Sequence, residues 1–200
     1  MAPLKQIDDA LCDQGFHIID DFLDEHHYQN LRAVILSMHN QAQFKSAKIG
    51  HARDAINETR IRNDQIYWLD EQTDDPSINA YFNAINKTAK ILNRSLFLGL
   101  VDFEAHFSAY KPGSFYKKHI DQFSTTKERR ISCVYYLNDE WQPNFGGELT
   151  LYNKQGIPLP GLLPHGNRFI CFNSDIPHEV QITHRMRYSI AGWFKVRALR

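Results

Sequence analysis

The chain changes from helical to strand patterning near residue 95, and this change restricts the fold more than any other feature. Before it, apolar residues recur at helical spacing in two places. Leu31, Ile35 and Met38 follow a cap at Asp24, and a longer stripe runs over residues 77–92. After residue 95, short segments rich in β-forming residues alternate with turns that contain Gly, Pro and Asn. Short strands without intervening helices favour a sandwich or jelly roll over a parallel α/β sheet.

We therefore expect a mainly β fold, with a double-stranded β-helix (jelly-roll) core in residues 96–200 and the helices of residues 1–95 packed on its larger sheet. No linker or repeat divides the sequence, so residues 1–200 are expected to form one domain. A polar stretch without periodicity, residues 45–63, is expected to be a functional loop. The expected strands are roughly 97–110, 115–120, 130–138, 147–152, 157–163, 168–173, 178–183 and 187–196.

Alternation along three of these strands separates an apolar face from a face with polar or small side chains. The second face carries Asp102, Glu104, His106, Ser108 and Tyr110 in one strand, Arg130, Ser132, Val134, Tyr136 and Asn138 in the next, and Arg187, Ser189, Ala191 and Trp193 in the last. A half-solvated sheet gives the same alternation. A cavity for an acidic ligand is the alternative, because an arginine among small residues suits a bound carboxylate.

Charge and cysteine content exclude several classes of function. The chain has 23 basic and 23 acidic residues, so it lacks the basic surface that non-specific nucleic-acid binding requires. No apolar run approaches the roughly 20 residues that span a bilayer, and acidic residues stand where a signal peptide has its apolar core. Cys12, Cys133 and Cys171 are scattered, without a CxxC pair. These features predict a reduced, cytoplasmic chain that binds neither nucleic acid nor membrane.

The spacing of two histidines and an aspartate indicates a metal site. His119 and Asp121 form an H-x-D in an extended segment, so they point to the same side, although such a pair alone is weak evidence. His178 opens a later strand that antiparallel pairing can bring beside them. Two imidazoles and one carboxylate form the facial triad of non-haem Fe(II) oxygenases, whereas a structural zinc site fills all its positions. Arg187, nine residues after His178, is expected to face the same cavity and to suit a carboxylate ligand.

These residues and their surrounding segments resemble the 2-oxoglutarate- and Fe(II)-dependent oxygenases, and within them the prolyl 4-hydroxylase-like branch. The segments that carry the resemblance, in family order, are HIIDDFL, RIRNDQIYWLDE, AYKPGSFYKKHID, YYLNDEW, GGELTLY, NRFICFNSDIPHEVQ and RYSIAGWF. Three of them, RIRNDQIYW, YYLNDEW and PHEVQ, are similar to the hypoxia-inducible-factor prolyl hydroxylases and their bacterial relatives. RRISCVYYLN and RYSIAGWF are just as similar to the ribosomal-protein prolyl hydroxylases of eukaryotes, so the nearest subfamily stays open.

The resemblance implies a metal and cosubstrate site. His119, Asp121 and His178 match the residues that bind Fe(II). Arg187 matches the residue that pairs with the distal carboxylate of 2-oxoglutarate, and Tyr136 matches a tyrosine that hydrogen-bonds that carboxylate.

Further positions match the walls and the entrance of the pocket. Tyr110 matches a tyrosine that lines the cosubstrate pocket, and Leu149 and Trp193 match residues that wall it. Arg130 matches a residue at the substrate entrance. The loop at residues 45–63 matches a segment that closes over the peptide substrate.

The activity implied by the resemblance is hydroxylation of a prolyl residue in a protein substrate. O2 and 2-oxoglutarate are the cosubstrates, 2-oxoglutarate is decarboxylated to succinate and CO2, and ascorbate is a candidate reductant. Hydroxylation of another side chain or of a small molecule stays open, as does the choice between C3 and C4 of proline. Two rival classes are a cupin-type metal enzyme that does not use 2-oxoglutarate and a non-catalytic binding module. Arg187 argues against the first rival, and the complete set of metal ligands argues against the second.

Overall fold

The computed structural model describes residues 6–47 and 58–197. The helices are α1 (Ile7–Asp13), α2 (Glu25–Asn40), α3 (Pro76–Leu96) and the 3₁₀-helix η3 (Pro143–Phe145). The strands are β1 (Phe16–Ile19), β2 (Lys45–Ser46), β3 (Gln65–Trp68), β4 (Asp102–Tyr110), β5 (Tyr116–His119), β6 (Arg129–Tyr136), β7 (Leu149–Leu151), β8 (Phe169–Asn173), β9 (His178–Val180) and β10 (Arg187–Lys195).

Both long helices begin at aspartate caps. The side chain of Asp24 accepts a hydrogen bond from the backbone N–H of His27 (3.1 Å) at the start of α2, which confirms the predicted cap. At the start of α3, Asp75 accepts from the backbone N–H of Ser77 (2.8 Å) and Pro76 takes the first helical position. The N–H of the first helical residue has no partner within the helix, so proline, which lacks this N–H, fits there. Helix α3 therefore begins one residue before the predicted stripe of residues 77–92.

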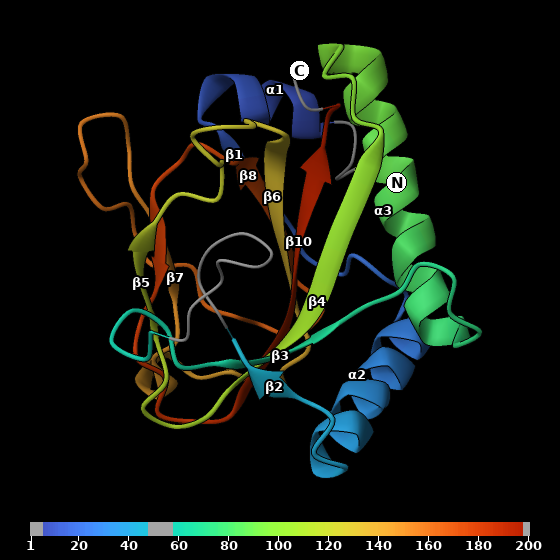
Figure 1. The fold of residues 1–200 in the computed structure, drawn as a ribbon, viewed down its shortest axis with the longest axis vertical. Helices are drawn as coiled ribbons and strands as arrows, with labels where there is room; N and C mark the ends of the chain where they lie inside the picture. Colours follow the sequence, from blue (N-terminus) through green and yellow to red (C-terminus); the bar gives the residue numbers. More distant parts are fainter. Residues whose placement is uncertain (1–5, 48–57, 198–200) are drawn as a thin grey trace.

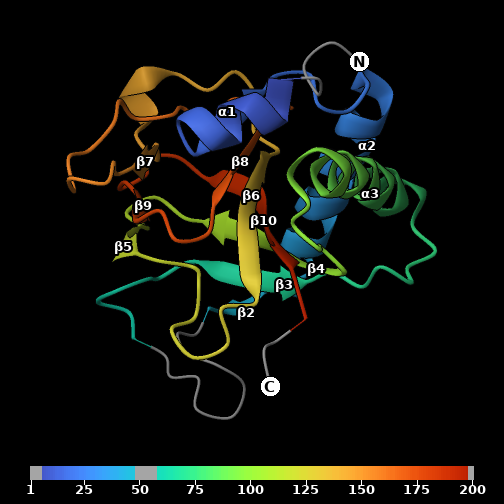
Figure 2. The ribbon, with the colours of Figure 1, turned by 90° about the horizontal axis from the view of Figure 1, so that it is seen from above.

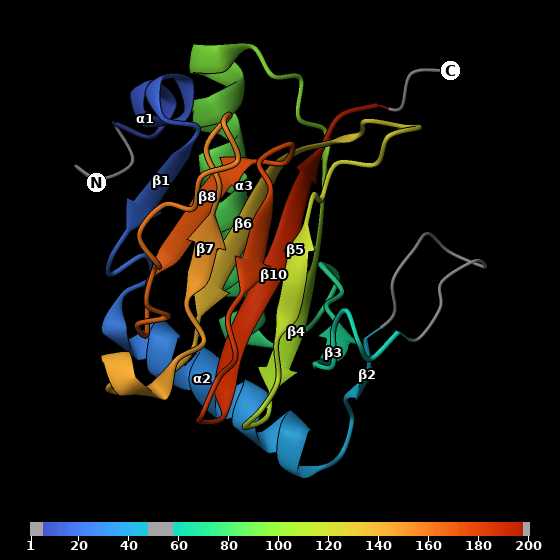
Figure 3. The same ribbon diagram turned by 90° about the vertical axis from the view of Figure 1, so that its left-hand side faces the viewer.

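The strands form two antiparallel sheets that face each other. The larger sheet has the order β1-β8-β6-β10-β4-β3-β2, and the smaller has the order β5-β9-β7. Figure 1 shows α2 and α3 on one side of the larger sheet, and Figure 2 shows the smaller sheet on its other side. Figure 3 shows the layers in order, with β5 and β7 in front and the helices behind. The predicted fold class, a mainly β jelly roll with helices on the larger sheet, is confirmed.

The hydrophobic core lies between the helices and the larger sheet. Ile85 of α3, Leu31 of α2, Phe107 of β4 and Tyr135 of β6 are completely buried in one cluster. Because side chains alternate along a strand, the residues next to these on β4 and β6 face the smaller sheet. The fold therefore holds one face of the sheet rigid in a packed core and leaves the other face to line the space between the sheets. No described helix is long and apolar enough to cross a membrane.

Three expected strands differ from the structure, and one of them, 178–183, ends at Val180. The segment 97–110 is a strand only from Asp102, because Phe97 (φ 52°) ends α3 in the left-handed conformation and Gly99 (φ 68°) continues the turn. The segment 157–163 forms only isolated bridges, Leu149 to Leu162 and Tyr152 to Pro158. Its prolines lack the N–H that a continuous ladder requires.

The region expected to be a loop, residues 45–63, begins with a two-residue strand and is followed by a second strand, and the sequence predicted neither. Lys45 and Ser46 form β2, which pairs with β3, and β3 pairs in turn with β4. Residues 48–57 lie outside the described residues, so closure of this region over a substrate stays a prediction.

Candidate active site

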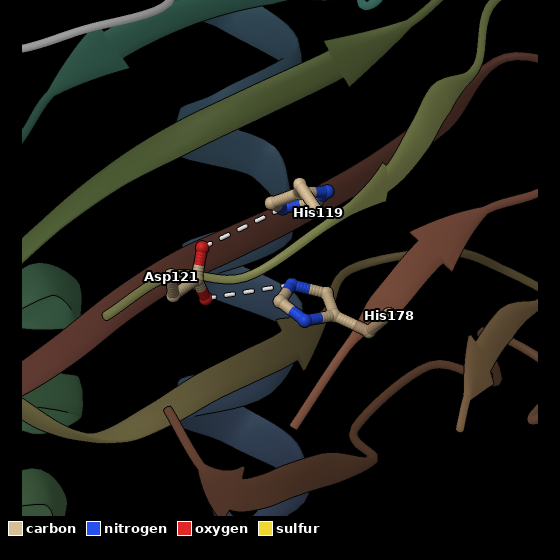
Figure 4. Close-up of side chains that lie close together, drawn as sticks. All are labelled: His119, Asp121 and His178. Atoms are coloured by element: carbon tan, nitrogen blue, oxygen red, sulfur yellow. Dashed lines mark ion pairs between the residues drawn. The ribbon is translucent and has the colours of Figure 1, made fainter. Parts of the chain in front are cut away.

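The structure brings the three predicted metal ligands together between the two sheets. His119 ends β5 and His178 begins β9, and the two are register partners on these adjacent strands. The Nε2 atom of His119 lies 3.5 Å from Oδ1 of Asp121, and Nε2 of His178 lies 3.4 Å from Oδ2 (Figure 4). One nitrogen or oxygen from each residue lies within 4.8 Å of the others. This spacing fits three ligands on one face of a single metal ion.

Backbone carbonyls fix the orientation of both imidazoles. Nδ1 of His119 lies 2.8 Å from the carbonyl oxygen of Lys117, and Nδ1 of His178 lies 2.9 Å from that of Ile176. A carbonyl only accepts hydrogen bonds, so each Nδ1 carries the proton and donates it. Each Nε2 is left with a lone pair directed at the cluster, which is the arrangement that outer partners impose on metal-binding histidines.

The carboxylate of Asp121 is also held in place. The hydroxyl of Ser132 donates to Oδ2 of Asp121 (2.7 Å) and lies 3.0 Å from the hydroxyl of Ser174. Burial would raise the pKa of Asp121, but the facing His178 and His119 and the Ser132 hydroxyl hold it below its usual range. Burial lowers the pKa of His178 to about 4. An ionised carboxylate and a neutral imidazole are the forms that bind metal.

Sequence reasoning missed three residues, Tyr116, Arg62 and Asp64, that pack in series against the ring of His119. The ring of Tyr116 stacks on His119 with centroids 3.6 Å apart, and the guanidinium of Arg62 lies 4.3 Å from the Tyr116 centroid. Arg62 forms two hydrogen bonds with the buried carboxylate of Asp64, at 2.8 and 2.6 Å. The available signal was the two-residue spacing of Arg62 and Asp64, which places both on one side of an extended segment.

A cavity of about 150 Å³ lies beside the metal ligands. It is lined by the three ligands and by four predicted site residues, Tyr110, Leu149, Arg187 and Trp193. Tyr136 does not line the cavity and lies behind Arg187, with its ring centre 4.9 Å from the guanidinium carbon. Other lining residues that sequence reasoning did not assign include Arg62, Trp68 and His106.

The buried guanidinium of Arg187 has no acidic partner among residues 6–47 and 58–197. Its side chain donates to the carbonyl oxygen of Gly147 (3.0 Å) and to the hydroxyl of Ser189 (3.2 Å), and no carboxylate of the described residues forms an ion pair with it. The neighbouring hydroxyl of Tyr136 is buried and finds no hydrogen-bond partner in the part of the chain that the structure describes. Burial raises the pKa of Tyr136, although the charge of Arg187 opposes this. A buried charge without a counterion is costly, so these two groups fit a bound carboxylate.

Comparisons with known proteins agree with this chemistry. A family model described as the 2OG-Fe(II) oxygenase superfamily matches residues 105–195. A Pseudomonas putida prolyl-4-hydroxylase of known crystal structure is 33% identical in sequence to this chain. The match covers 97% of this chain and 99% of the Pseudomonas chain, with a TM-score of 0.87. The chain belongs to the 2OG-Fe(II) oxygenase superfamily. Its membership confirms the family predicted from the sequence, whose members use Fe(II), 2-oxoglutarate and O2.

More distant relatives are also prolyl hydroxylases. The hypoxia-inducible factor prolyl hydroxylase of Caenorhabditis elegans is 26% identical over 92% of this chain, and human Egl nine homolog 1 is 24% identical over 96%. The chain spans only 27% and 46% of the length of these two proteins. A prolyl hydroxylase from Trichoplax adhaerens, solved with a peptide of hypoxia-inducible factor, has the same fold, with a TM-score of 0.87 at 24% identity.

The position of Arg130 at the substrate entrance stays a prediction, and a neighbouring arginine lines the cavity. Arg130, expected at the substrate entrance, is exposed and does not line the cavity, whereas Arg129 does. The register of β6 against β10 passes from Ile131–Phe194 to Arg129–Lys195, so Arg130 is the extra residue of a β-bulge. The bulge reverses the alternation and turns Arg129 toward the cavity. There Arg129 hydrogen-bonds Glu104 (2.7 Å) and covers the ring of Trp193 at 3.7 Å.

Proposed function

We propose that this chain is a 2-oxoglutarate- and Fe(II)-dependent dioxygenase that hydroxylates a prolyl residue in a protein substrate, acting as one domain. The observation that carries the proposal is the pairing of two sites across one cavity. A cluster of two imidazoles and a carboxylate lies on one side, and Arg187 lies on the other with no acidic partner among the described residues. A metal-binding protein with no acidic cosubstrate has no use for such a buried charge.

The metal cluster is assigned to Fe(II). Nε2 of His119, Nε2 of His178 and a carboxylate oxygen of Asp121 would hold the ion, and the Ser132 hydroxyl would keep the carboxylate oriented. The donor set fits Fe(II) because mixed imidazole and carboxylate ligands that leave open positions are typical of non-haem iron oxygenases. When bound, Fe(II) supplies the oxidation chemistry in which O2 converts 2-oxoglutarate to succinate and CO2 and one oxygen atom enters a C–H bond of the substrate.

The far end of 2-oxoglutarate is assigned to Arg187 and Tyr136. A guanidinium offers paired N–H donors to a carboxylate, and the Tyr136 hydroxyl, kept protonated by burial, offers another. The ring of Tyr110 lies 4.9 Å from the Arg187 guanidinium carbon and restricts its movement. Leu149 and Trp193 wall the cavity and exclude water from the bound cosubstrate. The residues thus hold the cosubstrate in register with the metal ligands.

A prolyl residue is proposed as the target because the relatives from Pseudomonas putida and Caenorhabditis elegans that this chain resembles are prolyl hydroxylases. The cavity also suits a proline ring, since Trp68, Tyr116 and Trp193 present aromatic surfaces around the metal ligands. Contact of the substrate with Arg130 stays a prediction, now beside the cavity-lining Arg129. A cytoplasmic location is supported by the three free cysteines. Ascorbate is retained as a reductant on the family resemblance.

The proposal is tested by anaerobic reconstitution with Fe(II) and 2-oxoglutarate, followed by admission of air in the presence of the proteome of the source cells with endogenous enzyme removed. We expect succinate release and a one-oxygen mass gain on a prolyl residue of at least one protein. Arg187→Met is the matched control and is expected to give neither. Iron-loaded protein that releases no succinate would favour a metal enzyme that does not use 2-oxoglutarate. Oxidation of a different side chain would retain the dioxygenase and reject the prolyl target.

A further inference from the structure

His106 of β4 lies in the wall of the cavity. Strand register places Trp68, His106, Ala191 and Val134 side by side on β3, β4, β10 and β6, and all four line the cavity. Strand β6 carries Ser132, which bonds the metal ligand Asp121. Because β4 is two strands from β6, His106 lies about 10 Å across the sheet from strand β6. A ligand that extends from the metal toward Trp68 must pass His106.

The contact of His106 with a backbone carbonyl is the basis for assigning its tautomer. Its Nδ1 lies 3.2 Å from the carbonyl oxygen of Phe107, which only accepts, so this bond requires the proton on Nδ1. The hydroxyl of Ser108, 3.0 Å from Nδ1, accepts from the same N–H, and in this tautomer Nε2 carries a lone pair. Both hydrogen bonds of the ring use Nδ1, so Nε2 remains as an acceptor on a ring that is 2% exposed. Burial and the charge of Arg62 lower the pKa of His106 to about 4, which keeps the ring neutral.

A neutral acceptor at this place does not suit 2-oxoglutarate. The cosubstrate is a dianion without N–H or O–H donors, so it offers nothing for the lone pair of Nε2. The carboxylate site proposed above also lies elsewhere, because Arg187 is opposite Tyr110 on β4, whereas His106 is opposite Ala191. The pair Arg187–Tyr110 and the pair Ala191–His106 are four residues apart along the strands, which corresponds to about 13 Å. The ligand of His106 must therefore carry a hydrogen-bond donor and occupy the other part of the cavity.

We propose that His106 is a specificity-determining residue that accepts a hydrogen bond at Nε2 from a main-chain N–H of the peptide substrate. Proline has no N–H, so the donor is the amide of a residue beside the target proline. The aromatic neighbours favour this contact, since Trp68 meets His106 edge-on with centroids 5.0 Å apart and Trp193 lies at 5.5 Å. Trp193 is buried and limits the access of water that would otherwise compete for the lone pair. This inference rests on the proposed function.

The test uses a library of nonapeptides with a central proline, and the best substrate is then methylated at one backbone nitrogen at a time. For the unaltered enzyme, one N-methyl position next to the proline is expected to lower kcat/KM at least tenfold. In His106→Leu, the KM for the parent peptide rises at least tenfold, and that N-methyl position no longer matters. The KM for 2-oxoglutarate stays within twofold. The matched control is His39→Leu, on α2, whose Nδ1 bonds the Tyr188 hydroxyl and which retains the N-methyl effect.

Each outcome decides between the two proposals. If no peptide or protein is hydroxylated, the proposed function fails, and the inference fails with it. If peptides are hydroxylated but N-methylation has the same effect in the unaltered enzyme and in His106→Leu, only the inference is overturned. Should His106→Leu fail to fold, ¹⁵N spectra of the unaltered enzyme loaded with Zn(II) give a second reading. The Nε2 resonance of His106 must then shift on peptide binding, and an unchanged resonance overturns the inference.

Discussion

The guanidinium carbon of Arg187 lies 4.9 Å from the centre of the Tyr136 ring, and the hydroxyl of that tyrosine is buried with no described residue as its hydrogen-bond partner. Two buried donors thus stand together with no acid near them among the described residues. Native interiors rarely leave such groups unpaired, so their pairing with a ligand explains why both are present. The same reasoning gives measurable consequences for binding and for stability.

Tyr136→Phe is expected to weaken 2-oxoglutarate binding without loss of stability. Removing one hydrogen bond to a charged group costs about 1.5–3 kcal/mol, so the KM for 2-oxoglutarate rises roughly 10- to 100-fold. The free energy of unfolding of the ligand-free protein is unchanged or slightly higher, because the deleted hydroxyl has no partner there. Steady-state kinetics and urea unfolding measure the two quantities. An unchanged KM would remove Tyr136 from the cosubstrate site.

Arg187→Met is expected to weaken 2-oxoglutarate binding more than Tyr136→Phe does, again with little effect on the free energy of unfolding. The variant loses the charge that attracts the carboxylate, so the KM for 2-oxoglutarate rises about 100-fold or more. The free energy of unfolding changes by less than about 1 kcal/mol, because the loss of two hydrogen bonds to neutral acceptors is offset by the removal of an unpaired buried charge. Thermal unfolding with and without 2-oxoglutarate measures both effects. A large destabilisation with unchanged KM would mean that Arg187 only supports the fold.

Asp64→Leu is expected to have the opposite profile, because it leaves the charge of Arg62 buried without its partner. Breaking such a pair costs about 3–5 kcal/mol of unfolding free energy. The double variant with Arg62→Met should recover most of this loss, since both charges are then absent. Urea unfolding of the two single variants and the double variant completes the cycle. Equal losses in Asp64→Leu and in the double variant would contradict a coupled pair.

Ser132→Ala is expected to weaken iron binding while it leaves the three ligands in place. Removing an outer partner of a metal ligand lowers metal affinity about 10- to 100-fold, and Ser132 holds Asp121 through a 2.7 Å bond. Anaerobic titration with Fe(II) gives the dissociation constant. Ser95→Ala, which removes an exposed hydroxyl on α3, is the control and should bind Fe(II) normally. Equal affinity in both variants would show that Asp121 needs no support from Ser132.

The sequence predicted that His119, Asp121 and His178 converge because their geometry follows from local rules. Two-residue spacing fixes His119 and Asp121 on one side, and antiparallel pairing of two strands supplies His178. The polar faces of β4 and β10 followed from the same alternation, and so did the cavity positions of Tyr110 and Arg187. These features need only the period of a strand and the order of the elements.

Other features depended on interactions that a strand period does not contain. The bulge at Arg130 shifts the alternation by one residue, so Arg129 takes the place in the cavity wall. Strand β3 has only four residues and gains its stability from pairing with β4. The alternation of its side chains is therefore too short to predict a strand from the sequence. Its position brings Arg62 and Asp64 to the site. The role of His106 required knowledge of which atom of its ring was already bonded.

The central claim is that one ferrous ion and one 2-oxoglutarate share the space between His119, Asp121, His178 and Arg187. The most direct measurement is anaerobic titration of the Fe(II)-loaded protein with 2-oxoglutarate, followed by the visible charge-transfer absorption that requires both in one site. We predict saturation at one 2-oxoglutarate per iron, one iron per chain, and no absorption in His178→Ala. Iron that binds equally well without His178, or an absorption that never develops in the unaltered protein, would contradict the account.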